Sequence, residues 1–406
     1  MTHRLVSLGF LSFVCLAGTC AEGTASDTAV RPGIDVLLQD SAHLLTDRRV
    51  GLLTNQTGVD RAGVGDLDRL LDAGAQVTAI FSPEHGYHGV LNLSEIGHTI
   101  DSASGLPVFS LYGATRAPTE SMFALVDVLV IDLQDIGARP YTYISSALHV
   151  MEACEAAGTP VIVLDRPNPI GGALVQGPIL DSALTSFIGM MAVPLRHGMT
   201  LGELALFGND RLGVGADLTV IPAAGWTRDA WFDSTGLPWV RPSPSMPNLE
   251  SATHYPGTVI FEATNLSVGR GTPVAFQVVG APWLDAASVV ELMGSLPGVE
   301  IRDTVVTPQS PPDRKFGGEP VQAVLLTVTD RAAYDPVLAA VSLLAAAWQL
   351  HPDTLTVNER GLAIRIGTED VWAAIQGGAT ADRIAEQWVV ALEEFREERQ
   401  EYVLYW

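Results

Sequence analysis

The stretch Val128-Leu-Val-Ile-Asp-Leu-Gln-Asp-Ile-Gly-Ala-Arg-Pro-Tyr-Thr-Tyr143 begins as a short apolar run and opens, after a carboxylate, into a polar loop. Comparable β-branched runs occur at residues 50–54, 77–81, 108–112, 161–165 and 218–221. Helix-like segments lie between them, at residues 67–72, 119–126 and 145–157. Continuous apolar strands that alternate with helices are typical of a parallel sheet covered on both faces. The sequence therefore predicts an α/β fold with a Rossmann-like parallel sheet domain over residues 33–255.

The last part of the chain has a different pattern. It predicts strands at residues 276–279, 324–328 and 362–366, and helices at residues 286–296, 337–348 and 381–399. Runs of strands that are not each followed by a crossover helix favour an α+β arrangement. We therefore expect a smaller C-terminal α+β domain, which binds substrate, over residues 256–406.

The charge of the chain excludes several classes of partner. Its 406 residues include 46 acidic and 23 basic side chains, a formal net charge of −23, and Lys315 is the only lysine. A nucleic-acid-binding protein needs a cationic surface that displaces counterions from phosphates, and the sequence has no cluster of Lys and Arg. We expect no nucleic acid among its partners.

The N-terminus has the residue pattern of an export signal. Arg4 precedes the apolar run Leu5–Ala17, and small residues follow up to Ala21. This pattern predicts a secretory signal peptide over residues 1–21 and an exported protein, periplasmic or extracellular. Cys20 offers an alternative, a lipoprotein with a lipid anchor at that cysteine. No other stretch is long and apolar enough for an integral membrane segment, and the remaining Cys154 is expected to be a small buried hydrophobe.

Polar side chains follow each predicted strand of the first domain. In an open parallel sheet the ligand crevice lies outside the carboxyl ends of the strands, so an active site is expected there. No G-x-G-x-x-G motif follows the first strand, so neither a dinucleotide nor any other cofactor is expected. The candidate site residues of this domain are Asn55, Glu84, His85, Arg116, Asp132, Asp135, Arg139, Tyr141, Tyr143, Arg166, Asn168 and His197.

Some of these residues have a structural interpretation as well. Asp132 and Asp165 stand at strand ends, where a carboxylate can cap the following helix. Thr200 and Glu203 have the spacing of a capping box at the start of a helix over residues 201–207. Glu84 lies between Pro83 and His85 on a glycine-flanked loop, where partial burial can keep a carboxyl group protonated for general-acid catalysis.

The second domain adds candidates in a loop at residues 261–272. Glu262, Asn265 and Arg270 are expected to face the first domain across a cleft. A cleft with carboxylates on both walls suits glycoside cleavage, in which one carboxyl group protonates the leaving oxygen and another assists from the opposite face. Glu84 is the predicted acid and Glu262 the preferred second carboxylate, with Asp132 and Asp135 as alternatives.

Seven ordered motifs carry a resemblance to a known family. They are FSPEHGYHG (81–89), LYGATRAPT (111–119), DLQDIGARPYTY (132–143), LDRPNPIGG (164–172), PLRHGMTLGELA (194–205), PSPSMP (242–247) and EATNLSVGRGT (262–272). In this order and spacing the chain closely resembles the NamZ-type exo-β-N-acetylmuramidases of bacteria. It differs from the family's usual residues at His88, Pro140, Ser245 and Ala263, which stand in place of Arg, Phe, Asn and Gly.

The resemblance implies a Rossmann-like domain and a smaller C-terminal domain with the active site between them. It also implies release of N-acetylmuramic acid from the non-reducing end of peptidoglycan fragments, with Glu84 as the catalytic glutamate. This sugar carries a lactyl carboxylate, which a guanidinium group can bind bidentately. We expect Arg139, Arg166 or Arg270 to recognise it.

Two other classes of function stay open from the residues. A metal-dependent hydrolase could be built from Glu84, His85, His88, Asp132 and His197, although the sequence has no close-spaced ligand motif. A non-catalytic peptidoglycan-binding protein would also suit an exported chain with Trp and Tyr near the cleft.

Overall fold

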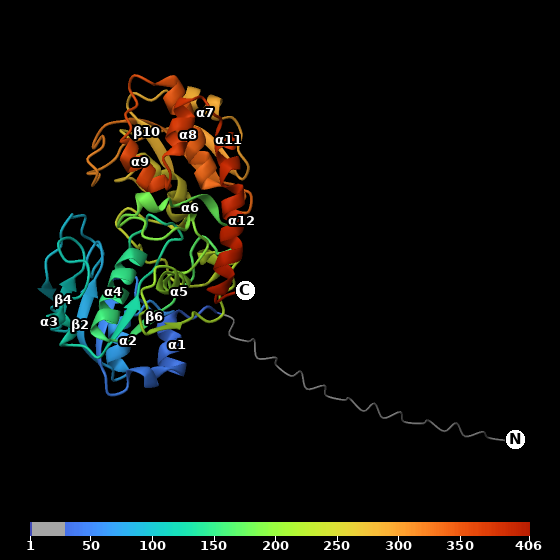
Figure 1. Cartoon of the computed structure of the whole chain (residues 1–406). Coiled ribbons are helices and arrows are strands. Elements are labelled where there is room, and N and C mark those ends of the chain that lie inside the picture. Colours follow the sequence, from blue (N-terminus) through green and yellow to red (C-terminus); the bar gives the residue numbers. More distant parts are fainter. Residues whose placement is uncertain (2–28) are drawn as a thin grey trace.

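The computed structural model describes residue 1 and residues 29–406, so the predicted signal peptide after Met1, with Cys20, lies outside the described residues. The described chain forms two lobes (Figure 1): an N-terminal lobe, residues 30–248, around a seven-stranded sheet, and a C-terminal lobe, residues 249–398, around a three-stranded sheet. The predicted α/β class with a smaller C-terminal region is confirmed. Within residues 29–406 no helix has both the length and the apolarity to cross a membrane.

The central sheet has the strand order β3-β4-β2-β1-β5-β6-β9, in which only the short edge strand β3 is antiparallel to its neighbour. The strands are β1 (Arg49–Thr54), β2 (Gln76–Ser82), β3 (Thr99–Ile100), β4 (Pro107–Ser110), β5 (Val128–Asp132), β6 (Val161–Leu164) and β9 (Leu218–Ile221). The strand order reverses between β1 and β5, where Thr54 pairs with Asp132. A crevice is expected at this reversal, because the flanking loops leave in opposite directions.

Helices cover both faces of this sheet. One face packs against α1 (Gly33–Asp40) and α2 (Asp66–Asp72), and the other against α3 (Glu120–Phe123), α4 (Tyr143–Ala157) and α5 (Leu201–Arg211). Side chains that are neighbours in sequence point to opposite faces of a strand. Accordingly, Leu52 and Leu53 belong to separate apolar clusters. Burial on both faces explains why these strands read as continuous apolar runs.

The C-terminal lobe is built on an antiparallel sheet of order β10-β12-β11. Its elements are α6 (Leu249–Thr258), β10 (Val278–Ala281), α7 (Ala286–Met293), β11 (Val299–Val306), β12 (Val321–Val328), α8 (Pro336–Leu350), α9 (Glu359–Ile366), α10 (Asp370–Gln376), α11 (Ala381–Ala385) and α12 (Val389–Glu398). The predicted boundary at residue 255/256 falls inside α6, which packs against α8. Buried side chains of both lobes form one apolar cluster, so the lobes share a core.

The strand predicted at residues 362–366 is wrong, because these residues lie in helix α9. The short run Leu-Ala-Ile-Arg-Ile is mostly apolar, as a buried strand would be, but Leu362, Ala363 and Ile366 are buried on one helical face. The capping residues are the signal that the sequence prediction missed: the Asn358 side chain accepts from the Gly361 N–H, and Gly367 has a φ of 100° just after the helix. Strand β11 was not predicted either.

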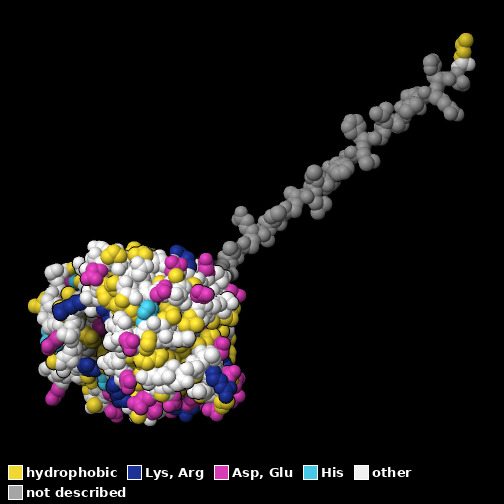
Figure 2. All heavy atoms as spheres, turned by 90° about the horizontal axis from the view of Figure 1, so that it is seen from above, with side chains coloured by type: hydrophobic (Ala, Val, Ile, Leu, Met, Phe, Trp, Pro, Cys, Tyr) yellow, Lys and Arg dark blue, Asp and Glu magenta, His cyan; other side chains and the backbone are white. Residues whose placement is uncertain are grey.

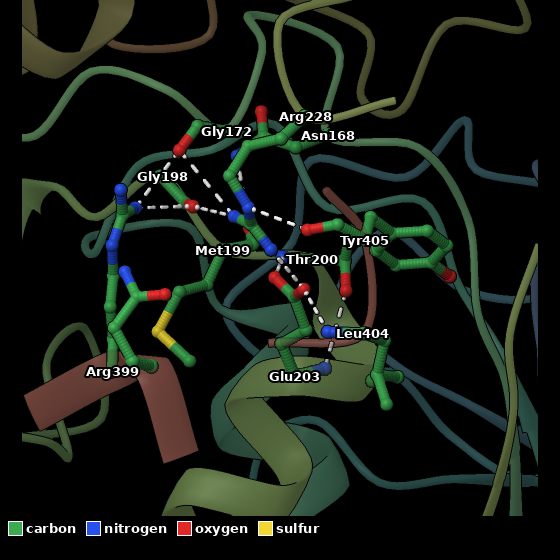
Figure 3. A network of polar contacts seen from close by, with 12 residues as sticks. Asn168, Gly172, Gly198, Met199, Thr200, Glu203, Arg228, Arg399, Leu404 and Tyr405 are labelled. Carbon is green, nitrogen blue, oxygen red and sulfur yellow. Dashed lines mark hydrogen bonds and ion pairs between the residues drawn. The ribbon is translucent and has the colours of Figure 1, made fainter. Parts of the chain in front are cut away.

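The end of the chain returns to the N-terminal lobe (Figures 1 and 3). Helix α12 runs from the C-terminal lobe toward α5, and the Arg399 guanidinium then donates to the carbonyls of Gly172 (2.9 Å) and Gly198 (2.7 Å). The Leu404 N–H donates to Glu203, which also forms the predicted capping box with Thr200. These contacts tie the end of the chain to the N-terminal lobe, next to core residues such as Phe395 and Tyr402.

A further contact of the chain end, from the Tyr405 hydroxyl to Asp165, predicts a pH-dependent stability. Asp165 is fully buried; it accepts hydrogen bonds from Thr200, Gly202 and Tyr405, and burial raises its pKa to about 6. Since the folded-state pKa lies above the unfolded value, this carboxyl group stabilises the fold at low pH, and the contribution is lost as pH rises from about 4 to 6.

The free energy of unfolding of the wild type should therefore fall by about 3 kcal/mol at most over this range, relative to Asp165→Asn. Urea denaturation at several pH values measures both proteins. Parallel pH profiles for the two would contradict the assignment.

Candidate active site

A cleft of about 490 Å³ opens between the two lobes. Its lining includes six of the residues that the sequence singled out: Glu84, His85, Tyr141, Tyr143, Glu262 and Arg270. Glu84, His85 and Tyr141 come from loops at the carboxyl edge of the parallel sheet, and Tyr143 is the first residue of α4. Glu262 and Arg270 come from the start of the C-terminal lobe. The structure thus brings these side chains from both domains to one cavity.

The loop after β5 (residues 132–143) organises one wall of the cleft. At its start the Arg166 Nη2 donates to Asp132 Oδ2 at 2.9 Å, and the same nitrogen donates to the Val59 carbonyl at 2.7 Å. Burial raises the pKa of Asp132, while the Arg166 guanidinium acts in the opposite direction. At the end of the loop the Tyr143 hydroxyl accepts from Asn55 and donates to the Pro242 carbonyl. Three chain segments are thereby fixed around the loop.

This loop also positions Glu84, which follows β2. The Thr142 hydroxyl donates to Glu84 Oε2 at 2.6 Å. Tyr112 lies beside the same carboxylate: burial raises the pKa of Tyr112, and the charge of Glu84 adds to the increase. His85 holds the loop in shape, with its Nδ1 2.7 Å from the Leu91 carbonyl oxygen. Glu84 therefore lines the cavity with the Thr142 hydroxyl bonded to Oε2 and Tyr112 beside it.

An aromatic floor of four rings runs beneath the cleft. Ring centroids lie 4.9 Å apart for Tyr143 and Tyr141, 5.9 Å for Tyr141 and Tyr255, and 4.8 Å for Tyr255 and Phe276. Burial raises the pKa of Tyr255, and the charges of both Glu262 and Glu84 raise it further. Tyr255 therefore lies within electrostatic reach of the carboxylates on both walls.

The opposite wall is basic. Arg270 Nε donates to Glu262 Oε1 at 2.9 Å, and Arg365 Nε lies 3.7 Å from Glu262 Oε2. Lys315 adds its ammonium group, which donates to the Leu266 carbonyl at 2.7 Å. We call Arg270, Lys315 and Arg365 the basic wall. Glu262 is thus an ion-paired carboxylate, in contrast to Glu84.

Backbone strain concentrates around this cleft. Within the described chain the non-glycine residues with positive φ include His85 (73°), Phe276 (64°), Arg314 (60°) and Phe316 (55°). His85 and Phe276 line the cleft, and the other two flank Lys315. Such conformations cost roughly 1–3 kcal/mol each and persist where the surroundings enforce them, often at functional sites.

The remaining candidates do not line the cleft. Arg116 lies at its rim, with its guanidinium 4.2 Å from the ring centre of Phe187. Arg139 donates to the carbonyls of Pro178, Val193 and Arg365, and Asn265 bonds to the backbone of Thr354 and Thr356. Those that hold loops behind the cleft, through partners inside the protein, are Asn55, Asp132, Asp135, Arg166, Asn168 and His197.

The candidate metal ligands are not assembled into one group. Asp132 is paired with Arg166, while His197 lies next to Asp135, with 3.5 Å between Nε2 and Oδ1. His88 is exposed. Over residues 29–406 the structure forms no set of three or more His, Cys, Asp or Glu side chains that could hold a metal ion.

Several lining residues were missed from the sequence, namely Tyr112, Phe187, Ser243, Tyr255, Phe276, Asp313, Lys315 and Arg365. Tyr112 and Ser243 lie in two of the seven motifs, LYGATRAPT (111–119) and PSPSMP (242–247), but were given no role there. One feature of the sequence could have singled out Lys315: it is the only lysine of an acidic chain. Arg365 was missed because it lies in the segment 362–366, which was wrongly predicted to be a strand.

The fold and the cleft define a class: a two-lobed α/β protein with carboxylates on both walls of an interdomain cavity, as in glycoside hydrolases. The chain belongs to the exo-β-N-acetylmuramidase NamZ family. The N-terminal model of that family matches residues 50–250 and the C-terminal model matches residues 253–405.

Individual relatives agree with this membership. The chain is 38% identical to the peptidoglycan β-N-acetylmuramidase NamZ of Bacillus subtilis (strain 168) over 416 residues, which cover 99% of this chain and all of that protein. Two crystal structures of DUF1343 family proteins from Bacteroides fragilis NCTC 9343 are 33% identical and each cover 93% of this chain. Their TM-scores are 0.86 and 0.75, and the matches cover 100% and 99% of those chains.

The buried pair at the end of β5 yields a stability prediction. The Arg166 and Asp132 side chains are 4% and 0% exposed, so Arg166→Met leaves an uncompensated buried carboxylate. We expect a loss of about 3–5 kcal/mol in the free energy of unfolding, measured by urea denaturation. Arg49→Met is the matched control, because the Arg49–Asp127 pair is about 40% exposed and its removal should have a much smaller effect. Equal losses in the two variants would contradict the organising role of the buried pair.

Proposed function

We propose that this protein is an exo-acting glycoside hydrolase that releases N-acetylmuramic acid from the non-reducing end of peptidoglycan fragments. The family membership and the full-length match to a peptidoglycan β-N-acetylmuramidase support the reaction. The observation that carries the proposal is the position of Glu84, which faces the interdomain cleft and is held there by Thr142. Muramic-acid-terminated oligosaccharides or muropeptides are the substrates.

Glu84 acts as the general acid. Thr142 occupies Oε2, so the proton is delivered from Oε1 to the glycosidic oxygen as the bond between that oxygen and the anomeric carbon breaks. The leaving sugar departs as an alcohol, and water supplies the hydroxyl group that ends on the anomeric carbon. The second proton of that water restores Glu84 at the end of the cycle. His85 shapes the Glu84 loop rather than transferring the proton itself.

Glu262 is the second carboxylate of this mechanism. It stands on the opposite wall, where Arg270 and Arg365 lie beside its two oxygens. A fixed negative charge across the cleft stabilises the positive charge that develops on the sugar ring. Among the arginines proposed for the lactyl carboxylate, Arg270 lines the cleft, whereas Arg139 and Arg166 use their guanidinium groups within the protein.

We also propose that the protein is exported, to the periplasm or the extracellular space. The support is the apolar run Leu5–Ala17 after Arg4, followed by small residues. A lipid anchor at Cys20 is the alternative form of the same export route.

Replacing the acid tests the reaction directly. Glu84→Gln keeps the size of the side chain but cannot donate the proton, so turnover of a muramic-acid-terminated disaccharide should fall by roughly 10²- to 10⁴-fold. A chromogenic glycoside with a good leaving group should be affected less, because its departure needs less protonation. Glu120→Gln, at an exposed position, is the control. Near-normal turnover of the disaccharide by Glu84→Gln would sink the general-acid role.

Thr142 is the positioning residue for this acid. Thr142→Val preserves the shape but removes the hydroxyl donor, and we expect kcat on the disaccharide to fall by roughly tenfold. Thr142→Ser keeps the donor and should recover most of the activity. Equal losses of activity in Thr142→Val and Thr142→Ser would contradict this positioning role, since Thr142→Ser retains the hydroxyl donor.

A further inference from the structure

We propose that Lys315, together with Arg365 and Arg270, forms a carboxylate-binding subsite at the C-terminal-lobe end of the cleft and selects sugars that carry a lactyl carboxylate. This inference rests on the proposed function and deepens it, because it adds Lys315 and Arg365 to the residues that contact the substrate. It makes both side chains specificity-determining residues, with no part in the proton transfer.

The first argument is charge. The basic wall carries three positive groups, and the carboxylates that line the cleft beside it are Glu262 and Asp313. One positive charge is therefore left over at this end of the cavity, in a chain whose formal net charge is −23. Figure 2 shows acidic side chains scattered over the visible face, with basic side chains singly or in small groups. A single carboxylate on a ligand would balance the excess.

The second argument is unused hydrogen-bonding capacity. Lys315 Nζ donates to the carbonyls of Leu266 (2.7 Å) and Phe261 (3.3 Å), and an ammonium group has three donors. Arg365 Nε is buried without a hydrogen-bond partner, since Glu262 Oε2 is 3.7 Å away. That nitrogen is itself enclosed by the protein, so the donor left for a ligand is the third hydrogen of Lys315 Nζ, on a side chain that lines the cleft.

The third argument is that the protein holds these cations in place at a cost. Burial lowers the pKa of Lys315, and the charges of Arg365 and Arg270 lower it further, although Asp313 and Glu262 oppose the change. The residues on either side of Lys315, Arg314 and Phe316, both have positive φ. An anion bound among the three cations would relieve their mutual repulsion.

Arg365 is held by an arginine behind the cleft. Arg139 Nη2 donates to the Arg365 carbonyl at 3.0 Å, close to the end of helix α9. The same helix packs beside the segment Val259–Ala263, which carries Glu262. Arg139 is thus a positioning residue for the subsite and does not itself touch the substrate.

The test compares three chromogenic glycosides in the full chain: N-acetylmuramic acid, the same sugar with its lactyl carboxylate converted to a primary amide, and N-acetylglucosamine. Lys315→Met should lower kcat/KM for the muramic acid glycoside by roughly 10- to 100-fold, mainly through KM. The amide and the N-acetylglucosamine glycoside should change by less than about threefold. Arg365→Met should act in the same direction, and Arg360→Met, exposed on the same helix, is the control.

Equal losses on the acid and the amide would overturn the subsite, as would unchanged kinetics of Lys315→Met on the acid. Thermal denaturation checks that each variant is folded. If Lys315→Met is not folded, Lys315→Gln is used in its place. Calorimetric titration with free N-acetylmuramic acid and free N-acetylglucosamine separates this inference from the proposed function. Preferential binding of the acid that is lost in Lys315→Met supports the subsite even if no glycoside is cleaved, whereas equal binding of both sugars by the wild type contradicts it.

Discussion

The buried ion pair between Asp132 and Arg166 is the constraint on which the rest of the site depends. It lies at the point where the strand order of the parallel sheet reverses, and Arg166 reaches from there to the Val59 carbonyl. A buried charge pair must be held in good geometry, because each partner alone would be strongly destabilising. The loop that begins at Asp132 is therefore fixed at its start. This in turn limits the positions open to Thr142 and Tyr143 at its end.

The cleft that results has two chemically distinct ends. Glu84 lies at the N-terminal-lobe end beside Tyr112 and Thr142, and the basic wall lies at the other end. The aromatic floor connects them, and its rings belong to the core that both lobes share. Since the floor belongs to this core, the fold fixes the distance between Glu84 and the basic wall. A sugar with a ring substituent that carries a carboxylate matches this polarity.

Much of the fold could be predicted from the sequence, because strands buried on both faces leave continuous apolar runs such as Val128–Asp132. The loop of Glu84 and the segment of Glu262 and Arg270 could be found as well, since polar residues beside Gly follow those elements. The arginines could not be sorted in the same way. A guanidinium that builds a loop, as in Arg139 and Arg166, has the same sequence signal as one that faces a ligand. Arg365 was missed because Leu362–Ile366 is a short, mostly apolar run like a buried strand, although helical caps at Asn358 and Gly367 decide the outcome.

The central claim is that one sugar spans the cleft, with its glycosidic oxygen at Glu84 and its carboxylate at the basic wall. The most direct measurement is a crystal structure of Glu84→Gln with a muramic-acid-terminated disaccharide bound. We predict the glycosidic oxygen within hydrogen-bonding distance of the residue 84 side chain and the lactyl carboxylate in contact with Lys315 Nζ. A disaccharide bound in the opposite direction, or one whose carboxylate lies in solvent away from Lys315, Arg365 and Arg270, would contradict the account.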